Sequence, residues 1–147
     1  MDFNFVSFNE LSASDLYAIL QVRQQVFILE QNCLYPDIDG NDLVAYHAML
    51  KDDNQLLAYG RFFLKGDFHA DYASIGRILV HPEYRKKQLG HALLKYILEE
   101  VESRFEYSAI KISAQTYLLE FYGKYGFKKV SAEYLEDGIP HVDMIKV

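Results

Sequence analysis

The stretch IGRILVHPEYRKKQLGHALL, residues 75–94, decides the fold because it joins a strand, a basic turn and a helix. Its first part is an apolar run that Pro82 ends, as expected of a strand. Three basic residues at 85–87 then lead into Gly90. Apolar residues follow at 89, 92, 93, 96, 97 and 101, a helical spacing that predicts a helix running to about Arg104.

A helix that begins directly after a basic turn can hold an anion. The first backbone N–H groups of a helix have no intrahelical partner, and they lie at the positive end of the helix dipole. About four such groups could be shared among the oxygens of a pyrophosphate, which makes it a better ligand than a monophosphate. Gly90 would let the backbone approach the ligand closely because it has no Cβ. The alternative is an ordinary capped helix beside a solvated basic turn.

Composition favours one globular domain spanning residues 1–147. Half of the residues are hydrophobic and 15% are aromatic, so a substantial core is expected. The net charge of −6 argues against a non-specific nucleic-acid binder, which needs a basic surface, and suits a cationic partner better. The start of the chain does not resemble a signal peptide, and no apolar run is long enough to span a membrane. With a single cysteine, Cys33, the chain is expected to be cytoplasmic.

The order of elements predicts a mixed α/β fold around one sheet. Ser12 is typical of a helix N-cap, and an apolar face continues from it as far as Phe27. Strands are predicted over 3–8, 43–51, 56–65, 72–81, 109–114, 127–135 and 141–147, with helices from about 13, over 89–104 and over 116–125. Strands and helices thus mix within one short chain.

Residues 75–94 resemble the acetyl-CoA signature of the GNAT N-acetyltransferases. The family's pattern is (Arg/Gln)-x-x-Gly-x-(Gly/Ala), and it lies between a strand and a long helix. In this sequence Arg85 fills its first place and Gly90 its last. Gln88 stands where the family usually has its first glycine. The backbone N–H groups bind the ligand in this family, so Gln88 can still offer its own if its backbone is helical.

A second signature follows at the family's usual distance. The segment AQTYLLEFYGKYGFKKV resembles the family's strand and helix ending in Tyr-x-x-x-Gly-Phe, with Tyr122, Gly126 and Phe127 in the matching places. Gln115 falls where the family often has an asparagine that contacts the pantetheine arm. The N-terminal half and the segment DGIPHVDM are similar to the ElaA-like branch of the superfamily, which also tends to lack the first loop glycine.

The resemblance implies a single GNAT-like domain: a mostly antiparallel, twisted central sheet that is splayed at the cofactor site and flanked by helices. It implies transfer of an acetyl group from acetyl-CoA to a primary amine, in a ternary complex and without a metal. The cofactor-binding residues that it implies are Ile78, Val80, Arg85, Lys86, Lys87, Gln88, Leu89, Gly90, His91, Gln115 and Tyr122. Of these, Ile78 and Val80 would act through their backbone groups.

Two side chains are the catalytic candidates. Tyr122 matches the family's general acid, and a phenol is protonated at neutral pH and can donate. His141 lies in a turn that resembles the branch, and histidine is suited to act as a base near neutrality. His47 and His81 compete for the role of base, and Glu30 could serve through a water molecule.

Arg23 and Glu30 are seven residues apart, so a helix would place them on one face, where they could form a structural ion pair. Alternatively, Glu30 and an acidic loop, above all Asp39 with Asp37 and Asp42, would form an acceptor mouth that attracts a cationic amine. The loop does not fit the EF-hand pattern, so we expect no metal site there.

The acceptor remains open among a small amine, a polyamine and a peptide amine, and the chain is expected to be a monomer or homodimer without nucleic-acid or membrane partners. The main alternative is a non-catalytic CoA-binding or interaction module with a GNAT fold. A further alternative is transfer of longer acyl chains, which the volume of the pocket beside Tyr122 would decide. Cys33 is expected only to pack.

Overall fold

The computed structural model describes residues 1–106 and 109–147. Its centre is one sheet in the order β1-β2-β3-β4-β5-β8-β6, with β7 paired to β8. The strands are β1 (Asp2–Ser7), β2 (Tyr46–Asp52), β3 (Gln55–Phe63), β4 (Ala73–Val80), β5 (Ile110–Gln115), β6 (Lys128–Lys129), β7 (Tyr134–Glu136) and β8 (Ile139–Lys146). Every pairing is antiparallel except that of β4 with β5, which confirms the mixed and mostly antiparallel sheet.

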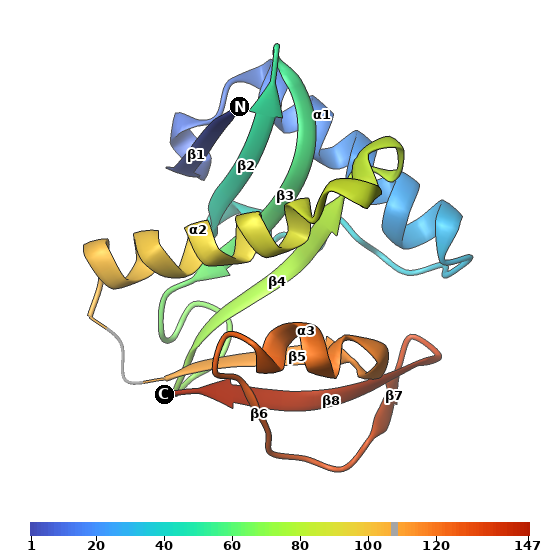
Figure 1. Cartoon of the computed structure of the whole chain (residues 1–147), viewed down its shortest axis with the longest axis vertical. Helices are drawn as coiled ribbons and strands as arrows, with labels where there is room; N and C mark the ends of the chain where they lie inside the picture. Colours follow the sequence, from blue (N-terminus) through green and yellow to red (C-terminus); the bar gives the residue numbers. More distant parts are fainter. Residues whose placement is uncertain (107–108) are drawn as a thin grey trace.

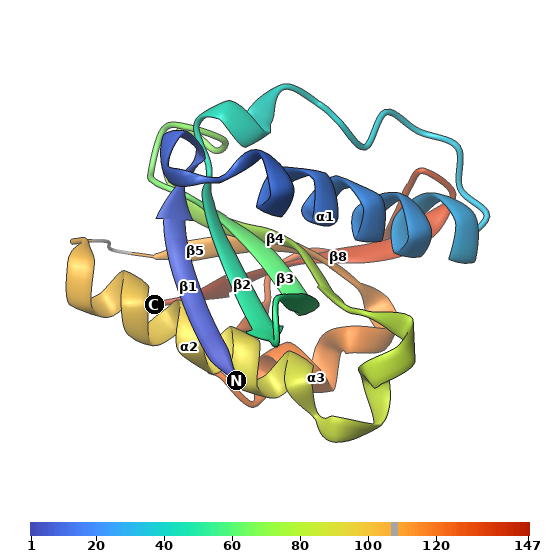
Figure 2. The ribbon, with the colours of Figure 1, turned by 90° about the horizontal axis from the view of Figure 1, so that it is seen from above.

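Helices cover both faces of the sheet (Figure 2). One face carries α1 (Ala13–Arg23), which continues as a π-helix over Gln24–Glu30. The other face carries α2 (Leu89–Arg104) and α3 (Leu119–Gly123). Gly60 on β3 lets α2 approach, because a Cβ there would lie 3.0 Å from Cδ1 of Ile97. No helix within the described ranges is long and apolar enough to cross a membrane.

The sheet opens between β4 and β5. The two strands pair only at Ala73 with Ile110 and at Ser74 with Lys111, and β4 then turns away from β5 (Figure 1). The register of β4 against β3 also shifts, and within this irregular stretch Arg77 has a φ of 52°. Such a backbone is unfavourable for a residue with a Cβ and marks a local constraint. The opening confirms the splayed sheet and leaves the outer part of β4 without a partner on the β5 side.

Arg23 is fully buried but does not pair with Glu30. Its Nε donates to Oδ2 of Asp37 at 3.0 Å, and its Nη1 donates to Oδ1 of Asp42 at 2.7 Å. The predicted pair with Glu30 is wrong because residues 24–30 form a π-helix, whose wider turn rotates each successive side chain less than an α-helix does. A residue seven positions after Arg23 therefore no longer lies on the same face of the helix. Glu30 instead contacts Arg85.

The acidic loop is neutralised by arginines from the sheet and α1. Nη2 of Arg61 lies 2.7 Å from Oδ2 of Asp39, and its Nη1 lies 2.8 Å from Oδ1 of Asp42. Nε of Arg77 lies 2.8 Å from Oδ1 of Asp37. Burial alone would raise the pKa of Asp39, but the hydrogen bonds and charge of Arg61 outweigh it and hold that pKa below its usual range.

We call these six residues the arginine–aspartate network: Arg23, Arg61, Arg77, Asp37, Asp39 and Asp42. Three positive charges balance three negative ones within it. The charges of this loop are therefore balanced inside the fold, and its role as a mouth that attracts a cationic acceptor stays a prediction.

The C-terminal region differs from the prediction in its strand boundaries. The single strand expected over 127–135 is divided into β6 and β7, both of which pair with β8. Asp137 and Gly138 connect β7 to β8 with φ angles of 51° and 78°, as a tight hairpin turn requires. This short turn lets β8 begin at Ile139, so that His141 lies inside a strand rather than in a loop.

Replacing Arg23 with methionine should destabilise the fold by about 3–5 kcal/mol, because Asp37 and Asp42 would be left buried with one partner fewer. Urea unfolding measures the change. Lys95→Met is the matched control, since Lys95 makes only an exposed contact with Glu99, and it should cost less than about 1 kcal/mol. Equal losses in the two variants would contradict the structural role of Arg23.

The stability of the fold should also fall as the pH drops below about 6.5, through His47. Burial lowers the pKa of His47 below its ordinary value, and the neutral ring contacts the Tyr59 hydroxyl at 2.6 Å and the Asp42 carbonyl at 2.9 Å. The unfolded chain therefore binds the proton more readily than the folded one. Acid lowers the free energy of unfolding by roughly 1.4 kcal/mol for each pKa unit by which folding lowers the pKa of His47.

Urea unfolding at pH 7.5 and pH 5 would show this dependence. His47→Gln should reduce the loss between the two pH values, whereas His81→Gln, at a partly exposed position, should keep the wild-type loss. An unchanged pH dependence in His47→Gln would refute the assignment.

Candidate active site

A cavity of about 1030 Å³ fills the opening between β4 and β5. Its lining includes Ile78, Val80, Arg85, Gln88, Gly90, His91, Gln115, Tyr122, His141, Glu30 and Asp39, so one space joins most of the predicted site residues. Leu89 does not line it and packs in the core instead. The side chains of Lys86 and Lys87 lie outside the described part of the chain.

The basic turn of the sequence forms a short 3₁₀ helix, Pro82–Lys87, before α2. Gln88 joins the two with a φ of 53° and a ψ of 33°, the left-handed conformation. The backbone of Gln88 is therefore not right-handed helical, and this geometry explains why glycine suits the position. The Gln88 side chain makes no capping hydrogen bond to α2, so the first N–H groups of that helix lack a side-chain cap.

Gly90 lies in the first turn of α2 and lines the cavity. A Cβ at this position would lie 3.5 Å from Cγ2 of Val80 and 3.6 Å from Cε1 of Phe121, which are ordinary contacts. The fold itself would therefore accept alanine here, and the absence of a side chain keeps the cavity open beside the N-terminus of α2.

Arg85 closes one side of this end of the cavity. Its Nη2 lies 2.6 Å from Oε1 of Glu30, and both side chains are partly exposed. The ion pair connects the end of the π-helix to the basic turn. Because Glu30 is paired with Arg85, it is not an unpaired carboxylate available to an amine.

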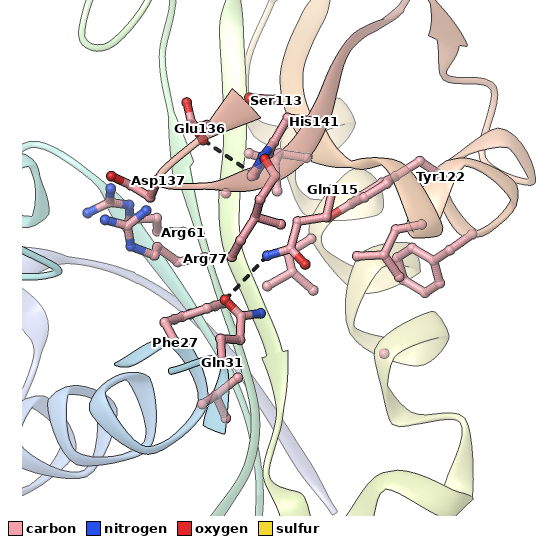
Figure 3. Close-up of a pocket in the computed structure, with 18 of the residues that line it drawn as sticks. Phe27, Gln31, Arg61, Arg77, Ser113, Gln115, Tyr122, Glu136, Asp137 and His141 are labelled. Atoms are coloured by element: carbon pink, nitrogen blue, oxygen red, sulfur yellow. Dashed lines mark hydrogen bonds and ion pairs between the residues drawn. The ribbon is translucent and has the colours of Figure 1, made fainter. Parts of the chain in front are cut away.

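Two contacts cross the cavity between its β4 and β5 sides. Nε2 of Gln115 donates a long hydrogen bond of 3.5 Å to Oε1 of Gln31 (Figure 3). The thiol of Cys33 donates to the carbonyl of Asp137 at 3.2 Å. Gln31 was not predicted as a site residue. It enters the site because the π-helix ends there, and no sequence pattern marks that turn.

Tyr122 lies on α3, buried against Phe121 and Phe127. Burial, with a smaller effect from Tyr117, raises the pKa of the Tyr122 phenol well above its ordinary value. The hydroxyl is therefore protonated at neutral pH, and it can donate a proton but cannot act as a base.

His141 is 7% exposed and lies opposite Gln115 in the pairing of β5 with β8. Its Nδ1 is 2.6 Å from the carbonyl oxygen of Ile139, so in the neutral ring Nδ1 carries the hydrogen and Nε2 carries a lone pair. Nε2 is 3.4 Å from Oε2 of Glu136.

The other two candidate bases do not reach the cavity. His47 is fully buried in contact with Tyr59, and His81 accepts the N–H of Glu83 at the start of the 3₁₀ helix. Neither of them lines the cavity. Within residues 1–106 and 109–147, no group of three or more His, Cys, Asp or Glu side chains is placed to hold a metal ion.

Sequence reasoning also missed Ser113, Tyr134 and Glu136, which line the cavity near His141 (Figure 3 labels Ser113 and Glu136). The alternation in IKISAQ was a usable signal for Ser113, since residues 111, 113 and 115 must share one face of a strand. Tyr134 and Glu136 gave no such signal, because β7 is only three residues long.

The sequence and the fold agree with known proteins. Residues 18–147 match the family described as the acetyltransferase (GNAT) domain. The chain is 40% identical to ElaA of Escherichia coli over 140 residues, which cover 94% of this chain and 91% of ElaA. The crystal structure of E. coli ElaA superposes with a TM-score of 0.92 at 35% identity, over all of both chains.

Two further structures share the fold. An acyl-CoA N-acyltransferase from Pseudomonas aeruginosa superposes with a TM-score of 0.92 at 39% identity, over all of both chains. An aminoglycoside 6′-N-acetyltransferase solved with coenzyme A has a TM-score of 0.72 at 16% identity, covering 99% of this chain and 96% of that one.

Proposed function

The chain belongs to the GNAT acetyltransferase family, and we propose that it transfers the acetyl group of acetyl-CoA to a primary amine while both substrates are bound. The observation that carries this proposal is the single cavity that reaches from the uncapped N-terminus of α2 to His141 and is also lined by Tyr122. One space can therefore hold a long activated donor and a second, smaller molecule.

The N-terminus of α2 would hold the pyrophosphate of coenzyme A. The backbone N–H groups at Leu89, Gly90 and His91 receive no capping hydrogen bond from the Gln88 side chain, and the positive end of a 16-residue helix favours an anion. Ile78 and Val80 lie where β4 has left β5, so their backbone groups would bind the pantetheine arm. Acetyl-CoA supplies an acetyl group that its thioester activates toward nucleophiles.

Tyr122 would act as the general acid. Its protonated phenol would give its hydrogen to the departing thiolate sulfur as the carbon–sulfur bond breaks. A backbone N–H of the open part of β4 would donate to the oxygen on which charge develops.

His141 would act as the general base. Its Nε2 lone pair would accept one proton from the ammonium, which frees the nitrogen lone pair to form the new carbon–nitrogen bond. The ammonium loses two protons in all: one leaves through His141, and the other restores the phenol of Tyr122. The partly exposed carboxylate of Glu136, 3.4 Å from Nε2, would lead the proton from the ring to solvent.

Calorimetric titration tests the donor site. The wild-type protein should bind acetyl-CoA and not ATP, and Gly90→Val should abolish that binding without unfolding the chain, because its branched side chain would occupy the space beside Val80 and Phe121. Gly90→Ala, which adds only a Cβ at ordinary contact distance, is the matched control and should stay folded and bind. Unchanged affinity in Gly90→Val would refute the assignment of this turn.

Tyr122→Phe should lower kcat by about 10²–10⁴-fold while the affinity for acetyl-CoA stays near that of wild type. The phenyl ring keeps the packing against Phe121 and Phe127, so only the donor is lost. Release of free coenzyme A thiol over an amine panel measures the rate. Tyr96→Phe, at a position outside the cavity lining, should leave it unchanged. If Tyr122→Phe keeps the wild-type rate, Tyr122 is not the acid; if the wild-type protein binds acetyl-CoA and acetylates no amine, the chain is a non-catalytic CoA-binding module.

A further inference from the structure

The wall of the cavity around His141 offers acceptors of hydrogen bonds rather than donors. The Tyr134 hydroxyl donates its one hydrogen to Oδ1 of Asp143 at 2.6 Å. The Tyr134 oxygen also forms a hydrogen bond with the Ser113 hydroxyl. Because the only hydrogen of the Tyr134 hydroxyl is already donated to Asp143, Ser113 must be the donor in this second bond. The Ser113 oxygen is then left with lone pairs to present to a ligand.

His141 and Glu136 continue this pattern. The single N–H of the neutral His141 ring points to the Ile139 carbonyl, so Nε2 is an acceptor. The Glu136 carboxylate is 52% exposed, and its Oε2 lies 3.4 Å from Nε2 of His141. We call Ser113, Glu136 and His141 the acceptor wall (Figure 3).

A primary ammonium matches the acceptor wall in number and kind. It has three N–H donors and no lone pair, whereas a hydroxyl brings one donor and two lone pairs that would face other lone pairs. The wall therefore favours an amine over an alcohol of the same shape.

Next to the acceptor wall the cavity becomes apolar and aromatic. Phe63 and Phe68 stack with their ring centroids 4.8 Å apart, and both line the cavity. Phe68 is 48% exposed, so a large apolar ring faces open space. Phe63 pairs with Ser74 on β4, Ser74 pairs with Lys111 on β5, and Ser113 lies two residues beyond Lys111, so the two rings are at the same end of the cavity as the acceptor wall. We call Phe63 and Phe68 the aromatic shelf.

The charged side chains around this end of the cavity can pair with one additional cation but not with several. The arginine–aspartate network is balanced within itself, and Asp143 is close to Lys111 at 3.8 Å. Glu136 and Asp137 are both exposed, and Glu136 is the one whose carboxylate lies beside the acceptor-wall ring of His141, at 3.4 Å. Glu136 is then the carboxylate left to meet a positive charge at this end of the cavity.

We propose that the acceptor is a primary amine with a single positive charge and an apolar, preferably aromatic, body. Its ammonium would lie on the acceptor wall of Ser113, Glu136 and His141, and its body on the aromatic shelf of Phe63 and Phe68. The inference rests on the proposed acetyltransferase function and narrows its acceptor, since a polyamine would leave its further charges without partners.

The test compares acetylation of phenylethylamine, spermidine and phenylethanol by the full chain, read as release of free coenzyme A thiol. Phenylethylamine should exceed spermidine in kcat/KM by about tenfold or more, and phenylethanol should not react. A higher kcat/KM for spermidine, or equal values for the two amines, would overturn the inference while leaving the acetyltransferase function intact. Failure of all three compounds and of a peptide amine, despite binding of acetyl-CoA, would instead overturn the proposed function.

Variants locate the subsite. Glu136→Gln and Phe68→Ala should each raise KM for phenylethylamine by about tenfold, while calorimetry shows an unchanged Kd for acetyl-CoA. Glu133→Gln is the matched control, because Glu133 is exposed in the same segment and does not line the cavity. An unchanged KM in either Glu136→Gln or Phe68→Ala would show that the amine binds elsewhere.

Discussion

The short parallel pairing of β4 with β5 is the constraint on which the rest of the molecule depends. Two residue pairs hold the strands together at one end, and beyond them β4 follows β3 while β5 follows β8. Unpaired backbone groups cannot be left facing an apolar core without a cost, so the opening must receive water or a ligand. The cavity thus exists because the sheet is incomplete between β4 and β5.

The irregular stretch of β4 requires support, and the arginine–aspartate network supplies it. Arg77 adopts a left-handed backbone, and its guanidinium is held by Asp37 and stacked near the ring of Tyr35. Arg23 holds the same aspartate from α1. The acidic loop therefore supports the opened strand, and its negative charges are balanced by the three arginines.

The two ends of the cavity have opposite chemical character. The N-terminus of α2 presents N–H groups without a side-chain cap and suits an anion, whereas the acceptor wall around His141 presents lone pairs and suits an ammonium. Gln115 is the last residue of β5 and Tyr122 lies on α3, and both line the same space. A donor that carries phosphates and an acceptor that carries an amine would consequently enter by different ends and meet inside.

The sequence by itself determined the general order of strands and helices, the mixed sheet, the basic turn before α2, and some of the residues that line the cavity. These features follow from local patterns: apolar periodicity, Pro82, Gly90 and two signatures at a set spacing. Only the tertiary structure decided that Arg23 pairs with Asp37, that His141 faces Glu136, and that Ser113 and Tyr134 belong to the site. The physical reason is that a π-helix changes the phase of side chains, and that the pairing of short strands such as β7 depends on partners far away in the chain.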